Sequence, residues 1–325
     1  MSWMKIFVLF LITLLSISMG ASVNTPLPLW YSMELNTSAI IPILALTNKI
    51  DKGMAMNMSV INSFCALVFV FISLSLDLFF FKGSTVEILC VIMMSSMLMK
   101  LGVFPFCFWF ISVMKSVSWF SFFMLSSIQK MLPMVVLIWM FMKINNFLLV
   151  MLLSLNSILA AMGTLKTNSV KLIFAFSSIS YTSWFILVSF NSSVVWLMSM
   201  LIYILNMMFI IKIISLKKLK MIKDSFKESS LVLIFLILNV GGLPPMSGFA
   251  MKLFMMKTLI FSGSNMILMG SFILMFSAIL ILFSYIKIII SSIMIVSVKM
   301  SWKIINNLKM MKFFVFLNLF LPLLV

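Results

Sequence analysis

The stretch that decides the fold is LVLIFLILNVGGLPPMSGFAMKLFMMKT, residues 231–258. It is long enough to cross a bilayer, because a membrane-spanning helix needs about 20 predominantly apolar residues. A Gly-Gly-Leu-Pro-Pro run at 241–245 interrupts it midway, and Lys252 follows a few residues later. Proline removes a backbone donor and clashes with the preceding turn. The pattern predicts a membrane helix that is broken at mid-depth beside a charged side chain.

A second apolar run, near 84–114, has the same combination of a helix breaker and a lysine. Lys100 comes just before the interruption. The residues expected to break the two helices are Gly102, Pro105, Gly241, Gly242, Pro244 and Pro245. Two broken helices of opposite direction are typical of inverted-repeat transporters. Two ordinary kinks are the alternative, and the lysine beside each break argues against it.

The composition predicts a chain solvated mainly by lipid. Hydrophobic residues make up 64% of the 325 residues, charged residues make up 9%, and the mean hydropathy is +1.28. A soluble domain is about 45–50% apolar and about 25% charged. We expect an all-α polytopic bundle forming one transmembrane domain over 1–325, with about eleven spans. These spans lie near 3–20, 25–47, 55–76, 84–114, 118–142, 146–164, 169–190, 193–214, 230–258, 264–291 and 312–325.

The lysines predict an orientation. With eleven spans, most loop lysines fall on one side of the membrane, including those of the loop 215–229, and only Lys82 and Lys143 fall on the other. Positive loops face the inside, so the N-terminus is expected inside and the C-terminus outside. The first span has features of a signal peptide, but we expect it to be retained.

Residue usage points to a compartment and excludes several functions. The sequence has 35 methionines, no histidine and no arginine, as expected of an AT-rich gene read with an animal mitochondrial code. Without histidine, a haem or zinc site ligated by imidazole is excluded. The three separate cysteines form no C-x-x-C pair, and the scattered lysines do not resemble a nucleic-acid-binding surface.

Ionisable residues at membrane depth are the candidate functional residues. A charge there costs about 2.5–3.5 kcal/mol on insertion scales, so it is usually retained for function. Glu34, Lys100 and Lys130 lie on the second, fourth and fifth predicted spans, and Lys100 comes just before the first break. Loss of hydration favours a neutral amine and a nearby carboxylate favours the ammonium, so the three residues are suited to a proton relay. A static ion pair that fixes helix register is the alternative. Lys257 is expected to reach the membrane surface instead.

Four segments resemble a known family. They are Trp30–Asn36 with the Ile41-Pro42 pair, Lys100–Trp109, Gln129–Pro133 and Gly241–Lys252, with a supporting run at Lys171–Ile179. Together they resemble the antiporter-like subunits of NADH:ubiquinone oxidoreductase (respiratory complex I), and among these the mitochondrially encoded chain 2 family.

The resemblance implies a proton-pumping membrane-arm subunit of the inner mitochondrial membrane with no cofactor or redox centre of its own. In that family, proton carriers correspond to Glu34, Lys100, Lys130 and Lys252. Its usual histidines are replaced here by Cys107 and Tyr181. Tyr181 is a candidate additional relay, because a phenol can donate and accept a hydrogen bond.

The expected partners are other membrane-arm subunits and phospholipid, with cardiolipin a candidate, and no nucleic acid. Two other functions stay open at this point. A free-standing cation/proton antiporter would work without an attached quinone reductase. A non-transporting scaffold subunit would need its buried lysines for assembly but not for pumping, and the missing histidines favour it.

Overall fold

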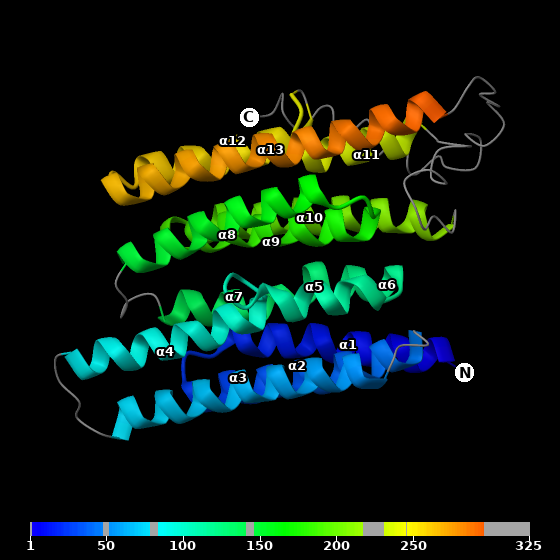
Figure 1. The fold of residues 1–325 in the computed structure, drawn as a ribbon. Helices are drawn as coiled ribbons and strands as arrows, with labels where there is room; N and C mark the ends of the chain where they lie inside the picture. The colour runs from blue at the N-terminus through cyan, green and yellow to red at the C-terminus, as the bar shows by residue number, and fades with distance from the viewer. Residues whose placement is uncertain are drawn as a thin grey trace. The chain divides into compact units, whose positions relative to one another are not determined.

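The structure is a computed structural model that describes residues 2–47, 52–78, 84–140, 146–216, 231–244 and 246–295. Within these ranges every regular element is a helix. Residue contacts divide the chain into two units, Met1–Leu153 and Ser154–Val325, and helix α8 (Asn146–Lys166) crosses the boundary. Figure 1 shows the helices of both units.

Unit 1 is a bundle in which consecutive helices pack side by side. α1 packs on α2, α2 on α3, and α3 on α4, and α7 packs on both α4 and α1. The elements are α1 (Ser2–Ser22), α2 (Pro26–Thr47), α3 (Lys52–Leu78), α4 (Ser84–Leu101), α5 (Cys107–Ser116), α6 (Trp119–Phe123), the π-helix η1 (Met124–Ile128) and α7 (Gln129–Met140).

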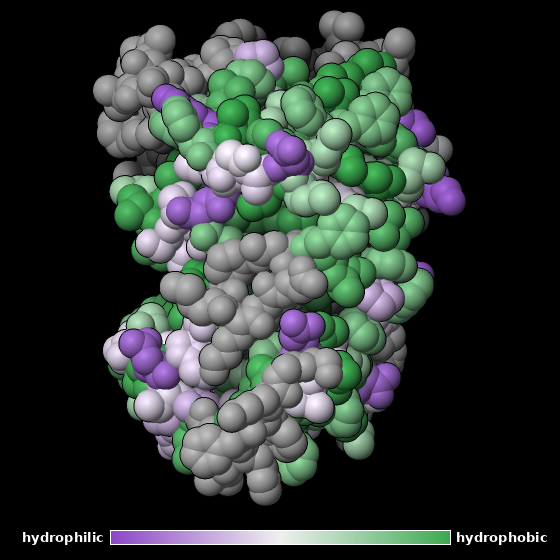
Figure 2. All heavy atoms as spheres, turned by 90° about the vertical axis from the view of Figure 1, so that its left-hand side faces the viewer, coloured by the Kyte–Doolittle hydropathy of each residue, from purple (hydrophilic) through white to green (hydrophobic). Residues whose placement is uncertain are grey.

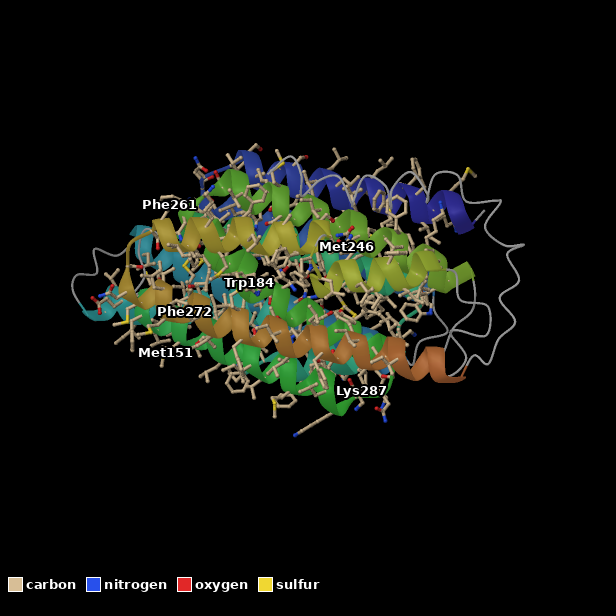
Figure 3. The ribbon with its side chains drawn as sticks, turned by 90° about the horizontal axis from the view of Figure 1, so that it is seen from above. Met151, Trp184, Met246, Phe261, Phe272 and Lys287 are labelled. Atoms are coloured by element: carbon tan, nitrogen blue, oxygen red, sulfur yellow. The ribbon has the colours of Figure 1, made fainter. Side chains whose placement is uncertain are left out.

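Unit 2 is organised around α9, which packs on α10, α12 and α13. Most of α9 is buried, including Trp184, which lies among the helices in Figure 3. The elements after α8 are α9 (Val170–Asn191), α10 (Ser193–Leu216), α11 (Leu231–Gly241), α12 (Ser247–Phe261) and α13 (Asn265–Ile295).

The helices suit a lipid environment on both their outer and inner faces. Large apolar side chains such as Phe71, Phe272 and Phe276 are exposed, and much of the surface in Figure 2 is hydrophobic. Inside, serine and threonine hydroxyls donate to carbonyls of their own helix, as Ser178 does to Ala175 O at 2.7 Å. Such bonds satisfy polar groups that lipid would leave without a partner.

Seven of the described helical segments are long and apolar enough to cross a membrane. The described part is therefore a multi-pass helical membrane protein, whereas the count of eleven spans stays a prediction, as does a single domain over 1–325. Several predicted features lie outside the described residues: Pro245, nearly all of the loop 215–229, and the last span at 312–325.

Candidate functional site

In unit 1, the helix that carries Lys100 ends in a tight glycine turn. Helix α4 ends at Leu101, and Gly102 has a φ of +69°, a conformation that favours glycine. The Gly102 amide donates to Met99 O at 3.1 Å and the Val103 amide donates to Leu98 O at 3.0 Å. These two bonds form a Schellman cap, which satisfies carbonyls that the helix can no longer pair.

The same turn occurs in unit 2, between α11 and α12. Gly242 has a φ of +84°, and its amide donates to Asn239 O at 3.1 Å, while the Leu243 amide donates to Leu238 O at 3.2 Å. In both units a further bond of 2.8 Å closes the next turn, from Phe106 N to Val103 O and from Met246 N to Leu243 O. Similar sequences thus produce the same hydrogen-bond pattern at both helix ends.

Lys252 lies across the turn in unit 2. It is 6% exposed, and its Nζ donates to Gly241 O, the last carbonyl of α11, at 2.7 Å. Its side chain covers Gly242, where a Cβ would lie 2.8 Å from Nζ. The carbonyl end of a helix carries partial negative charge, so the ammonium is held where the backbone stabilises it.

Tyr181 caps the neighbouring carbonyl. From α9, its hydroxyl donates to Val240 O at 2.5 Å, and the centroid of its ring lies 5.3 Å from Lys252 Nζ, within cation–π range. The ring also packs against Phe185 and Tyr203. The Tyr181 hydroxyl therefore donates its hydrogen bond to a backbone carbonyl at the same helix end that holds Lys252.

A buried carboxamide joins three helices at this turn. Asn239, near the end of α11, accepts hydrogen bonds at Oδ1 from Gly248 N (2.7 Å) and Ser247 Oγ (2.9 Å), in the first turn of α12. Its Nδ2 donates to Oδ1 of Asn206 on α10 at 3.0 Å. The residue at the N-cap position of α12 is Met246, marked in Figure 3, which offers no side-chain cap. Asn239 therefore caps α12 from the other side of the glycine turn.

Lys100 is the contrasting case in unit 1. Its side chain is 4% exposed, yet Nζ has no hydrogen-bond partner among the described residues. It lies near enough to Cys65 and Glu34 for electrostatic interaction with both. The Glu34 carboxylate is partly exposed and accepts a bond from Thr37 Oγ1 at 3.5 Å. The structure thus has no direct Glu34–Lys100 hydrogen bond of the kind that a static pair requires.

Lys130 is also buried, at 4% exposure, on α7. Its Nζ lies 4.5 Å from the centroid of the Phe110 ring on α5. Phe110 in turn packs against the first break, since a Cβ on Gly102 would lie 2.7 Å from the Phe110 Cβ. One aromatic side chain therefore connects the glycine turn with the lysine.

The turn before Lys130 is unusual. Residues Met124–Ile128 form a π-helix, and single π-turns inside α-helices are frequent at functional sites. Gln129 follows it and is 5% exposed, and neither of its amide atoms has a hydrogen-bond partner among the described residues. Such a buried amide needs a partner such as water.

Sequence reasoning missed Asn239, Asn206 and the π-helix, and it assigned no role to Gln129. The signal for Gln129 was a polar residue inside an apolar span. Lys257, which was expected to reach the membrane surface, is exposed. Cys107, which stands where the family usually has histidine, begins α5 and is partly buried. No cluster of three potential metal ligands occurs among the described residues.

The chain is similar in sequence to known proteins. NADH-ubiquinone oxidoreductase chain 2 of Locusta migratoria is 34% identical over 262 residues, covering 77% of this chain and 76% of the relative. The protein of the same name from Anopheles gambiae is 29% identical over 270 residues, covering 78% of this chain and 76% of the relative. No family model matches the sequence.

Two solved respiratory assemblies contain chains of the same fold. A chain of Thermus thermophilus respiratory complex I superposes with a TM-score of 0.79 at 14% identity, covering 98% of this chain and 78% of that one. A chain of an archaeal membrane-bound sulfane sulfur reductase superposes with a TM-score of 0.77 at 15% identity, covering 97% and 72%.

The fold is that of helical membrane chains found in such respiratory assemblies. With the relatives above, the particular family follows: the chain belongs to the NADH-ubiquinone oxidoreductase chain 2 family.

Proposed function

We propose that this chain is a proton-translocating membrane-arm subunit of mitochondrial NADH:ubiquinone oxidoreductase, coupling electron transfer from NADH to ubiquinone to proton pumping. One observation carries the proposal: Lys100, Lys130 and Lys252 are each at most 6% exposed within helices whose outer faces are apolar. Buried charge in such a setting is costly and is usually functional.

In the proposed path, Glu34 modulates the charge on Lys100, Lys130 passes the proton laterally, and Lys252 serves the exit or the link to the next subunit. The Lys100 ammonium and the Gln129 amide have no hydrogen-bond partner within the ranges that the structure describes, which supports water-mediated transfer in unit 1. Transfer from Lys130 to Lys252 would pass from one unit to the other. Tyr181 is left out of this path, because a backbone carbonyl cannot pass on the proton that its hydroxyl donates.

The proposal includes the setting of the chain. It would lie in the inner mitochondrial membrane, with its N-terminus in the matrix and its C-terminus in the intermembrane space. Its partners would be other membrane-arm subunits and phospholipid, including cardiolipin. The redox centres would lie in those partner subunits, so this chain would hold no cofactor.

The Lys130→Met variant tests the function. Assembled complex carrying the variant is reconstituted in vesicles, and protons translocated per electron are measured during NADH oxidation by a ubiquinone analogue. Lys115→Met is the matched control, because Lys115 is an exposed lysine at the end of α5. We expect a lower proton stoichiometry only for Lys130→Met. An unchanged value would remove Lys130 from the path.

The same preparations separate the two alternatives. A scaffold subunit predicts less assembled complex with normal protons per electron in what remains. A free-standing antiporter predicts that the chain migrates as a single small species in mild detergent.

A further inference from the structure

Helix α12 depends on a residue outside it for the capping of its first turn. A helix begins with amide groups that have no intrahelical acceptor, and the residue just before it usually supplies one. The Met246 side chain provides no acceptor. Asn239 supplies it from eight residues upstream of Ser247, through bonds to both Ser247 Oγ and Gly248 N.

The same contact fixes how closely α12 approaches the end of α11. A Cβ at Gly248 would lie 1.7 Å from the backbone carbonyl oxygen of Asn239, so the two backbones are in direct contact. Gly248 and Lys252 are four residues apart and therefore share a face of α12. Holding Gly248 against Asn239 thus turns Lys252 toward Gly241 O and Gly242.

A hydrogen bond to α10 also fixes the Asn239 side chain. Asn239 Nδ2 donates to Asn206 Oδ1, and both side chains are at least 97% buried. A buried amide left without a partner is costly, so the carboxamide of Asn239 has one strongly favoured orientation. That orientation presents Oδ1 to α12.

We propose that Asn239 is a positioning residue for Lys252: through its bonds to Asn206, Ser247 and Gly248 it sets the place and rotation of α12 that bring the ammonium to Gly241 O. This inference rests on the proposed function for its consequence in pumping, but its structural content stands separately. Asn239 itself carries no proton in the scheme.

The first test is structural. Asn239→Leu keeps the number and branching of the side-chain heavy atoms and removes all three bonds. A density map of the assembled variant complex should show Lys252 Nζ displaced from hydrogen-bond distance of Gly241 O. The control is Asn156→Leu, which removes another buried asparagine of unit 2, one bonded to Ile179 O and Ser183 Oγ. Lys252 should stay in place in the control. Lys252 still bonded to Gly241 O in Asn239→Leu would overturn the proposal.

The second test asks whether Asn239 acts through Lys252. Protons per electron are compared for Asn239→Leu, Lys252→Met and the double variant. We expect Asn239→Leu to lower the value toward that of Lys252→Met, and the double variant to match Lys252→Met alone, because coupled residues are not additive. An additional loss in the double variant would show an independent structural effect and overturn the proposal.

The two failures are distinguishable. Normal pumping by Lys252→Met would contradict the proposed role of Lys252, while the density map would still decide the position of α12. If Asn239→Leu does not assemble, Asn239→Ser takes its place in the map, because a shorter hydroxyl cannot reach both Gly248 N and Asn206. Lys252 unmoved in that variant would equally contradict the inference.

Discussion

The two glycine turns share a hydrogen-bond pattern, but the lysines beside them are held differently. In unit 1, Lys100 lies before Gly102, and the end of α4 is capped without it: the indole Nε1 of Trp109 donates to Met99 O at 2.9 Å. In unit 2, Lys252 lies after Gly242 and is itself part of the cap, through Gly241 O. Among the described residues, therefore, the lysine at one turn has no hydrogen-bond partner, and the lysine at the other is bonded to the turn.

The difference indicates two roles for one kind of residue. A buried ammonium without a protein partner can exchange a proton with water at little structural cost. An ammonium bonded to the helix end must first break a bond that also stabilises the turn. We infer that unit 1 is suited to rapid exchange and unit 2 to a step that requires movement of the α11–α12 turn.

The largest loss of stability is expected from a side chain added at Gly248, where α12 contacts the end of α11. Gly248→Ala would place a Cβ 1.7 Å from Asn239 O, and a backbone atom cannot easily move away. Overpacking of this kind costs about 1–3 kcal/mol or more. We expect much less assembled complex on native gels and a lower unfolding temperature.

Gly53→Ala is the control for that substitution, since nothing lies within 4 Å of the added Cβ. It should assemble normally. The position equivalent to Gly248 in unit 1 is Phe108, whose side chain is exposed, so the requirement for glycine is specific to unit 2. Normal assembly of Gly248→Ala would mean that the approach of α12 to α11 is looser than described.

The next largest effect on stability is expected from substitution of Lys252, in comparison with Lys100. Lys252→Met removes the donor to Gly241 O, leaves a buried carbonyl unpaired and should lower stability by about 1–3 kcal/mol. Lys100→Met removes an amine that has no hydrogen-bond partner in the described part of the chain, so stability should stay the same or rise. Unfolding temperatures of the two variant complexes provide the measurement. Equal destabilisation by both would remove the distinction between the units.

The smallest effect is expected from two tyrosine hydroxyls. Tyr181→Phe loses the bond to Val240 O, and Tyr285→Phe loses a bond of 2.7 Å to Ser177 Oγ. Each should cost about 1 kcal/mol of stability, the usual net value of a hydrogen bond. Protons per electron should stay unchanged in both. A drop in Tyr181→Phe alone would restore Tyr181 as a relay residue.

The sequence predicted the helices and turns more successfully than the contacts at the turns. Long apolar runs specify helices, and rare glycines and prolines mark where α4 and α11 end. The bond between Lys252 and Gly241 was not predictable, because its partners are eleven residues apart on two helices separated by a turn. The cap by Asn239 was not predictable either, because the residue at the usual capping position is Met246, whose side chain cannot cap a helix. No residue pattern indicated the π-helix before Gln129.

The most direct test of the account is a density map of the intact complex at a resolution that shows ordered water. The account predicts water within hydrogen-bond distance of Lys100 Nζ and of the Gln129 amide, and a direct bond without water between Lys252 Nζ and Gly241 O. Dry hydrocarbon around Lys100 and Gln129, or these side chains turned outward to lipid headgroups, would contradict it.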